Sequence, residues 1–288
     1  NIDAGRLPNF ARLAAMSTWY SNTTTVSSQT ERAIASILSG MHTQVETAPI
    51  YTQFPQNIFT VMAASHSVHA TETVSRLCPD AICQAEAQEV DRSFDRAAMY
   101  ADIRIIFWHS VLPAPIAAQW LPPISSSWKG FTAATPANNA EASEEDDLHW
   151  FVAMVADMTA SDQKRFASFV RSVAGAETSS FHYLHLALPH TPWIYLPDGR
   201  VYNGRFTPGQ SSTSYDWQEN QFLVDQGALR YSLQVEYVDE LLGELLDALE
   251  NHPRADDFLL IVTSDHGVAF APGEMRRRPV ASTLADVA

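Results

Sequence analysis

An apolar run near the end of the chain, from Phe258 to Ser264, constrains the fold more than any other feature of the sequence. Its length and its β-branched residues predict a buried strand. Asp265 and His266 follow directly where the run ends. In an open α/β sheet, ligands bind outside the carboxyl ends of the strands. A carboxylate and an imidazole at that edge would form a ready pair of metal ligands.

Helical and extended patterns alternate along the rest of the chain, which predicts an α/β fold with a largely parallel sheet. The expected helices cover residues 5–16, 28–39, 57–64, 91–112, 162–174 and 221–250, and the expected strands cover 67–73, 181–188 and 258–264. In the second helix, Ala33, Ile34, Ile37 and Leu38 share one face. Gly40 is expected to end that helix as a C-cap. The last helix has apolar residues at steps of four, namely Leu229, Leu233, Tyr237, Leu241 and Leu245.

Composition restricts the classes of function. The 288 residues are 46% hydrophobic, enough for one large α/β domain or two smaller ones. The net charge of −15 argues against a nucleic-acid partner, which needs a basic surface. No apolar stretch is long enough to span a bilayer. The chain begins without an initiator Met or a signal region and resembles mid-protein sequence at both ends, so we expect a fragment.

The two cysteines, Cys78 and Cys83, are separated by four residues that include Pro79. Two cysteines alone cannot form a four-ligand zinc site. An even count at short range favours a small loop closed by a disulfide, which implies an oxidising compartment. The alternative is a pair of unrelated buried thiols.

The segment from Ser27 to Gly40 has two interpretations. Ser28 with Glu31 fits a Ser-x-x-Glu capping box at the start of a helix. A helix N-terminus also presents free N–H groups that suit a phosphate or sulfate anion. The hydroxyl of Thr30 could then act as a nucleophile, provided that a metal lowers its pKa.

A third element is the turn Leu188-Pro-His-Thr-Pro-Trp193, which places His190 at the carboxyl edge of a strand. A histidine in a turn can equally be a plain surface residue. The two histidines inside the strand, His182 and His185, lie on opposite faces. We expect both to be hydrogen-bonded core residues rather than ligands.

These elements, in this order, resemble the alkaline phosphatase and sulfatase superfamily. The closest likeness is to its membrane-anchored bacterial members, the sulfatase-like and phosphoethanolamine or phosphoglycerol transferase group. The resemblance covers Leu7–Leu13, Thr30–Gly40, Leu188–Trp193 and Thr263–Gly267, and thus most of the chain. It implies an alkaline-phosphatase-like three-layer α/β sandwich with a largely parallel central sheet. It also implies a single catalytic domain over residues 1–288, truncated at both ends. Composition separately predicts a loop-rich insertion at 113–150, where small and acidic residues replace large apolar ones.

The resemblance assigns roles to particular residues. In sulfatases, a cysteine matured to formylglycine lies ten positions before the glycine that ends the helix, and Thr30 occupies that position here. Arg32 and Ile34 stand where the sulfatase pattern has Pro or Ala and then Arg, which argues against formylglycine chemistry. A threonine nucleophile is typical of the phosphate-transferring members. Asp265 and His266 match the metal pair.

His190 matches the histidine that contacts the anionic ester group. Arg277, within the run Arg276–Arg278, could hold the same anion. The arginines could equally form a solvated basic turn. Family members carry a further acidic metal ligand after their first strand, which this chain begins too late to include. Many transferases also have a histidine after the Asp-His-Gly motif, and the stretch that follows Gly267 supplies none.

The resulting hypothesis is a metal-dependent hydrolase or transferase that acts on a phosphodiester through Thr30. Asp265, His266 and Thr30 would hold one divalent metal, with zinc or manganese favoured over calcium or magnesium because the ligands mix nitrogen and oxygen. The missing acid predicts that residues 1–288 alone are weakly active or inactive. Alternatives are a sulfuric ester hydrolase of the same superfamily, a non-catalytic relative that binds an anionic glycan or lipid headgroup, and a serine hydrolase using Ser27 or Ser28. The last lacks a Gly-x-Ser-x-Gly elbow.

The resemblance also implies partners and a location. The substrate would be a small-molecule, lipid or glycan ester. We expect an extracytoplasmic location, on the periplasmic or cell-surface side. Attachment to the inner membrane would come through segments outside these residues.

Overall fold

The structure is a computed structural model, and it describes residues 2–20, 22–43, 47–83, 103–104, 107–108, 111–112, 162–202, 208–210 and 216–277. Contacts divide the chain into two units, residues 1–85 with 154–288 and residues 86–153. The elements described below all belong to the first unit. The expected insertion at 113–150 and most of the expected helix at 91–112 lie outside the described residues.

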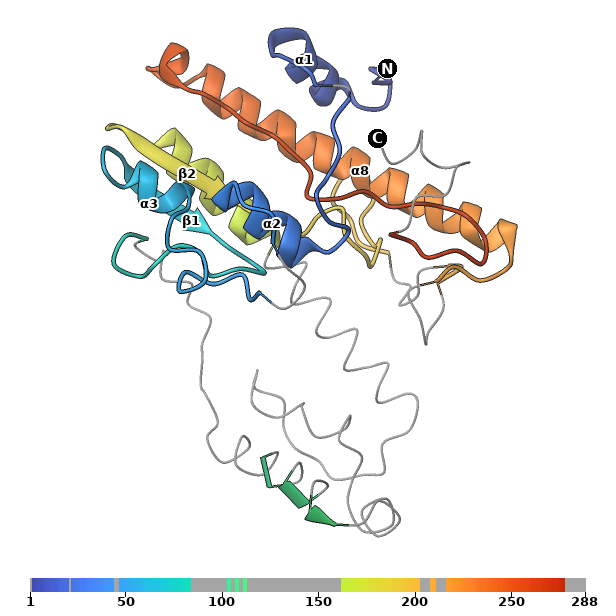
Figure 1. Ribbon diagram of the computed structural model, residues 1–288. Helices are drawn as coiled ribbons and strands as arrows, with labels where there is room; N and C mark the ends of the chain where they lie inside the picture. Colours follow the sequence, from blue (N-terminus) through green and yellow to red (C-terminus); the bar gives the residue numbers. More distant parts are fainter. Residues whose placement is uncertain are drawn as a thin grey trace. The chain divides into compact units, whose positions relative to one another are not determined.

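Two parallel strands form the sheet of the described residues (Figure 1). β1 (Ser67–Thr71) pairs with β2 (Ser180–Leu184), and His69 lies opposite His182 in the register. β1 begins at the predicted residue and ends two residues early, whereas β2 begins one residue early and ends four residues earlier than expected. The fold is α/β, as the alternating pattern predicts, because helices pack on both faces of this strand pair.

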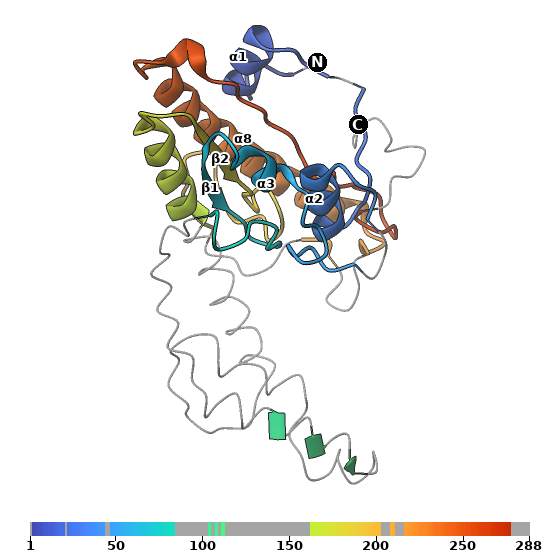
Figure 2. The same ribbon diagram turned by 60° about the vertical axis from the view of Figure 1, so that its left-hand side comes forward.

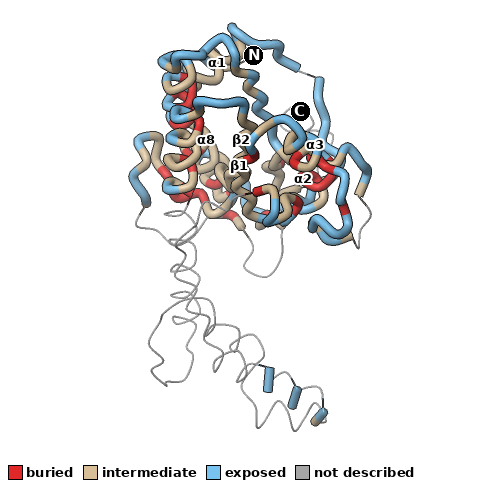
Figure 3. Tube along the Cα trace, turned by 90° about the vertical axis from the view of Figure 1, so that its left-hand side faces the viewer, coloured by how far each residue is buried: buried red, intermediate tan, exposed pale blue. Residues whose placement is uncertain are grey.

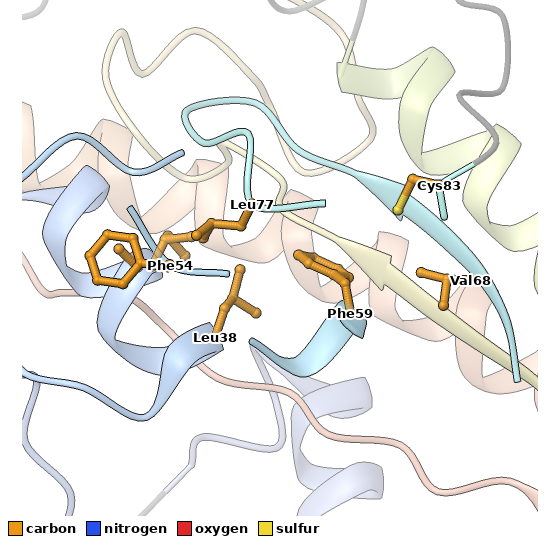
Figure 4. Close-up of a cluster of buried hydrophobic side chains, with 8 residues drawn as sticks. Leu38, Phe54, Phe59, Val68, Leu77 and Cys83 are labelled. Carbon is orange, nitrogen blue, oxygen red and sulfur yellow. The ribbon is translucent and has the colours of Figure 1, made fainter. Parts of the chain in front are cut away.

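The first face of the strand pair packs against α2 (Thr30–Ser39) and α3 (Ile58–Met62). Val68, Phe181 and Tyr183 point to this side, where the side chain of Phe59 is completely buried. The ring of Phe59 meets that of Tyr183 edge-on, with ring centroids 5.2 Å apart. Figure 4 shows this cluster, with Leu38, Phe54, Leu77 and Cys83 around Phe59. Removing its apolar surface from water holds α2 to the sheet.

The second face packs against the helical residues 162–174 and against α8 (Gln221–Glu250). Figure 2 shows the strand pair between the helix of residues 162–174 and α3, and Figure 3 shows buried positions along α8. The stripe predicted for α8 is buried at Tyr237, Leu241 and Leu245, whereas Leu229 is exposed. Among the described residues, no helix is apolar enough over a sufficient length to cross a membrane.

α2 confirms its predicted C-cap but corrects its predicted N-cap. Gly40 has a left-handed φ of 69°, and its N–H bonds the Ser36 carbonyl at 2.8 Å. Glycine suits this position because it has no Cβ to clash in that conformation. The expected capping box of Ser28 is absent, since the N-cap is Gln29 and no side chain caps it. Ser27 Oγ instead accepts from Gln29 N at 3.1 Å, so the hydroxyl binds just outside the helix.

The strand predicted at residues 258–264 is wrong for the described part of the chain. These residues run extended without strand pairing, after the 3-10 turn η1 (Ala255–Asp257). The exposed fractions of Leu259 and Ile261 are 86% and 75%, while Leu260 packs into the core against the second face. The apolar pattern identifies side chains that favour a sheet, but a strand also needs a neighbour with matching free N–H and C=O groups. Figures 1 and 2 show this segment running back from α8 toward α2.

The predicted disulfide joins Cys78 to Cys83, whose Cα atoms are 5.9 Å apart. Glu72, directly after β1, holds the same loop through hydrogen bonds. Its carboxylate accepts from the backbone N–H groups of Leu77 and Cys78, each at 2.9 Å. The loop that follows β1 is therefore fixed both covalently and by a carboxylate.

α1 (Pro8–Met16) docks on α8 through a buried carboxylate. The N-cap of α1 provides no side-chain hydrogen bond, and α1 buries no residue of its own. Asp239 of α8, which is 1% exposed, accepts from Asn9 N at 3.1 Å, Asn9 Nδ2 at 3.0 Å and Phe10 N at 2.7 Å. Asp239 thus satisfies N–H groups that a helix N-terminus leaves free, and its charge suits the positive end of the helix dipole.

Replacing this carboxylate should detach α1. In Asp239→Ala, two backbone N–H groups and one amide lose their acceptor, so we expect the free energy of unfolding to fall by about 3 kcal/mol. Urea denaturation followed by circular dichroism would measure the change. Asp225→Ala, at an exposed position of the same helix, serves as the control and should change stability by less than about 0.5 kcal/mol. Equal effects of the two substitutions would contradict the role of Asp239.

Candidate functional site

The structure brings together the three side chains that the sequence proposes as metal ligands. Thr30 Oγ1 lies 3.0 Å from His266 Nε2, and Asp265 Oδ2 lies 3.4 Å from the same nitrogen. These residues come from the N-terminus of α2 and from the extended segment after α8. The side chains of His266 and Asp265 are only 11% and 19% exposed. A carboxylate, an imidazole and a hydroxyl therefore meet at one partly buried point.

The two ring nitrogens of His266 have different neighbours. Nδ1 lies 3.0 Å from the carbonyl oxygen of Gly267, and a carbonyl can only accept, so Nδ1 donates there. Nε2 lies on the other side, within hydrogen-bonding distance of Thr30 Oγ1. A metal shared with Thr30 and Asp265 would be held by Nε2, because that nitrogen lies beside both of their oxygens.

Two local features hold this cluster. Thr30 is the first residue of α2, so its hydroxyl lies at the positive end of the helix. Thr25 Oγ1 donates a hydrogen bond to the backbone carbonyl of Asp265. The segment before α2 is therefore tied to the segment after α8, although neither belongs to a regular strand.

His190 and Arg277 form a second pair of functional groups. His190 Nδ1 lies 2.7 Å from the Thr191 carbonyl oxygen and so carries the proton of the neutral ring. Arg277 Nη2 donates to His190 Nε2 at 2.8 Å. Arg277 Nη1 also donates to the Ser28 carbonyl oxygen at 3.2 Å. Arg277 therefore links the turn of His190 to the backbone just before α2 and Thr30.

The surroundings of His190 favour the neutral form of its ring. Its pKa is lowered chiefly by desolvation from the groups packed around the ring, although part of the residue remains exposed. The hydrogen bond to the Thr191 carbonyl raises the pKa, while Arg277, His266 and Arg276 lower it. A neutral imidazole beside a permanent guanidinium charge can take up a proton once an anion neutralises the arginine.

His185 is hydrogen-bonded, as the sequence interpretation expects, but it lies closer to the site than the predicted strand implies. β2 ends at Leu184, so His185 already lies past the carboxyl end of the strand, and Thr73 Oγ1 bonds its Nδ1. Burial lowers its pKa most, Asp265 raises it, and His190 lowers it. The ring is thus within electrostatic range of both halves of the site. The sequence does not show that β2 ends before His185, because the apolar residues after His185 continue the pattern of a strand.

Tyr183 is a further polar group near the cluster. Its hydroxyl is buried and, among the described residues, has no hydrogen-bond partner. Burial raises the pKa of this phenol, and the charges of Glu72 and Asp265 raise it further. The Tyr183 hydroxyl is therefore within electrostatic range of Asp265.

Three other residues considered from the sequence, His182, Arg276 and Arg278, do not belong to the two groups described above. His182 lies on the second face, stacked on His69 with ring centroids 4.8 Å apart, and both its ring nitrogens bond serine hydroxyls. It is hydrogen-bonded, as expected, but only partly buried. Arg276 lies near enough to His190 to lower its pKa, whereas Arg278 lies outside the described residues.

The donor set fits a small divalent cation. The described residues contain no group of three or more His, Cys, Asp or Glu side chains placed to hold a metal. Asp265 and His266 supply two such donors, and the Thr30 hydroxyl supplies a third on the same side. One nitrogen and two oxygens suit zinc or manganese better than calcium, which prefers oxygen alone.

Comparison with protein families gives one finding that agrees with this geometry. The family model described as Sulfatase matches residues 3–284. Comparison with curated proteins and with solved structures gave no match. Enzymes of the matched family act on esters, have an alkaline-phosphatase-like α/β fold and use a divalent metal. Since the match covers almost all of its residues, the chain belongs to the sulfatase family.

Proposed function

We propose that the protein cleaves or transfers a phosphodiester through Thr30 as the nucleophile. The observation that carries this proposal is the 3.0 Å contact between Thr30 Oγ1 and His266 Nε2, with Asp265 Oδ2 3.4 Å from that nitrogen. A threonine hydroxyl is too weakly acidic to ionise near neutral pH without help. A divalent cation held by Asp265, His266 and Thr30 would supply that help by lowering the pKa of the hydroxyl.

The residues of the chain divide the reaction between them. The Thr30 hydroxyl gives up its proton to solvent water, and Thr30 Oγ1 attacks phosphorus to form a phospho-threonine. The bond between phosphorus and the leaving oxygen breaks, and that oxygen takes a proton from water to leave as the alcohol. Arg277 and His190 bind the non-bridging oxygens, where negative charge concentrates. Water or an acceptor hydroxyl then attacks phosphorus and releases Thr30. Thr30 lies at the N-terminus of α2, whose dipole favours an anion at that point.

The cysteines support phosphate over sulfate as the transferred group. A formylglycine made from cysteine needs a free cysteine, and the two cysteines of this chain are joined to each other in the loop after β1. Oxidising the side chain of Thr30 would give a ketone rather than the aldehyde of formylglycine, because its Cβ carries a methyl group. Thr30 therefore suits direct attack by an alkoxide.

We propose an extracytoplasmic location, because a disulfide in a loop persists in an oxidising environment. Attachment to a membrane through other segments is the part of this proposal that rests on the family resemblance. There the available phosphodiesters include lipid and glycan headgroups. The partner in this proposal is therefore an ester of that class and not a nucleic acid, because the chain has a net charge of −15.

Removing the Thr30 hydroxyl should abolish turnover. With bis(para-nitrophenyl) phosphate as the probe and the intact protein, we expect Thr30→Ala to lower kcat by about 10³-fold or more. Thr30→Ser keeps a hydroxyl at the same place and should retain measurable turnover. Mass spectrometry of acid-quenched enzyme should find the phosphoryl adduct on the peptide that contains Thr30.

The exposed Thr18→Ala is the control and should leave kcat unchanged. Unchanged activity of Thr30→Ala would rule out Thr30 as the nucleophile. Turnover of para-nitrophenyl sulfate in place of the phosphodiester, with an aldehyde on the peptide, would show a formylglycine sulfatase instead.

Metal content should depend on the Asp265 and His266 pair. Elemental analysis of the intact protein should find about one zinc or manganese per chain, because the donors mix nitrogen and oxygen. Asp265→Ala and His266→Ala should each lose most of it, whereas the exposed control Asp225→Ala should retain it. Full metal content in Asp265→Ala would place the metal elsewhere.

A further inference from the structure

Gln234 lies near the middle of α8 with its side chain completely buried, at 0% exposure. Its amide oxygen accepts from Ile194 N at 2.9 Å and from Tyr195 N at 3.2 Å. Its amide nitrogen donates to the His190 carbonyl oxygen at 2.9 Å. All three hydrogen bonds therefore go to the backbone of one turn, residues 190–195. A buried amide without partners would be costly, so these bonds specify where the turn lies.

The turn reaches α8 through apolar contacts as well. Ile194 and Tyr195 are buried in the cluster on the second face, and the ring of Tyr195 stacks on that of Tyr237 with centroids 4.7 Å apart. These contacts hold the far end of the turn. His190, at the near end, lies outside that cluster and is partly exposed. Among the hydrogen bonds from α8, the one from Gln234 Nε2 is the bond that reaches the backbone of His190.

The orientation of the His190 ring depends on its backbone. The ring donates from Nδ1 to the Thr191 carbonyl and accepts at Nε2 from Arg277. Gln234 binds the carbonyl of the peptide unit between His190 and Thr191, and the Thr191 carbonyl that accepts from Nδ1 belongs to the next unit along the chain. A displacement of the first unit would carry both the ring and its acceptor with it. A shift there would move the imidazole and its contact with the guanidinium together.

We infer that Gln234 is a positioning residue, which fixes the backbone of His190 so that its imidazole and Arg277 present one site to the anionic ester. This inference rests on the proposed function, because it takes His190 as the group that meets the substrate. Gln234 acts through His190 and does not itself touch the reacting atoms. The competing explanation is that Gln234 only stabilises the packing of α8 against the turn.

A double-mutant cycle separates the two explanations. Gln234→Met has the same length but no hydrogen-bonding atoms, and with a phosphodiester probe we expect kcat/KM to fall about tenfold through the lost bonds. In a His190→Ala background, the same substitution should change kcat/KM less than about twofold, because the ring that it displaces is absent. Equal losses in the two backgrounds, or no loss in the wild-type background, would overturn the inference.

A conservative variant controls for folding. Gln234→Glu occupies the same volume, and burial keeps its carboxyl group protonated. One oxygen can then accept from Ile194 and Tyr195 while the hydroxyl donates to the His190 carbonyl. We expect Gln234→Glu to recover most of the kcat/KM that Gln234→Met loses. Gln221→Met, at an exposed position of α8, should match the wild type. Failure of Gln234→Glu to recover activity while it remains folded would contradict the positioning role.

A second readout does not depend on activity. The ring signals of His190, assigned by their absence in His190→Ala, can be followed by NMR of histidine-labelled protein. In Gln234→Glu these signals should stay near the wild-type positions, and in Gln234→Met they should move, while Gln221→Met leaves them in place. If the wild type does not turn over phosphodiesters, the proposed function fails, and unmoved His190 signals in folded Gln234→Met would then overturn the positioning role separately.

Discussion

Parallel pairing of β1 with β2 places the carboxyl ends of both strands at one edge of the sheet. In the register, Thr71 lies opposite Leu184. The next residues along each strand, Glu72 and His185, therefore leave the sheet at the same level. Glu72 uses its carboxylate to hold the loop that follows β1, whereas His185 is within electrostatic range of Asp265. Without the pairing, neither residue would have a fixed place near the other.

The faces of the strand pair connect this edge to the helices. One face holds α2, whose first residue is Thr30, and the other holds α8, whose buried Gln234 holds the His190 turn. Apolar burial supplies the non-directional attraction, and buried polar groups such as Gln234 and Asp239 determine the exact position. The candidate site therefore depends on packing that lies well away from it.

Sequence patterns predict the parts of this structure that local chemistry determines. The end of α2 at Gly40, the length of α8 and the Cys78–Cys83 disulfide each follow from neighbouring residues in the chain. The failures are non-local. Residues 258–264 have the composition of a strand, but pairing depends on a neighbour that composition does not identify.

In the candidate site, too, local patterns predict some residues, while the places of others depend on distant parts of the chain. The motifs locate Thr30, His190, Asp265 and His266, since each follows a recognisable local pattern. The end of β2 hides His185, because the apolar residues that follow it continue the pattern of a strand. Gln234 could not be found from the sequence, because a glutamine within a helix has no distinctive pattern and its partners lie some forty residues away along the chain.

The contact of Arg277 with His190 couples the binding of an anion to the binding of a proton. While the guanidinium donates to Nε2, that nitrogen has no free lone pair and the nearby positive charge opposes protonation. An arriving anion would draw Arg277 to itself, because hydrogen bonds between two charged groups are the stronger ones. The nitrogen would then be free, next to a negative charge, and its proton affinity would rise. By thermodynamic linkage, capture of the anion brings uptake of a proton with it, and acidity in turn strengthens the hold on the anion.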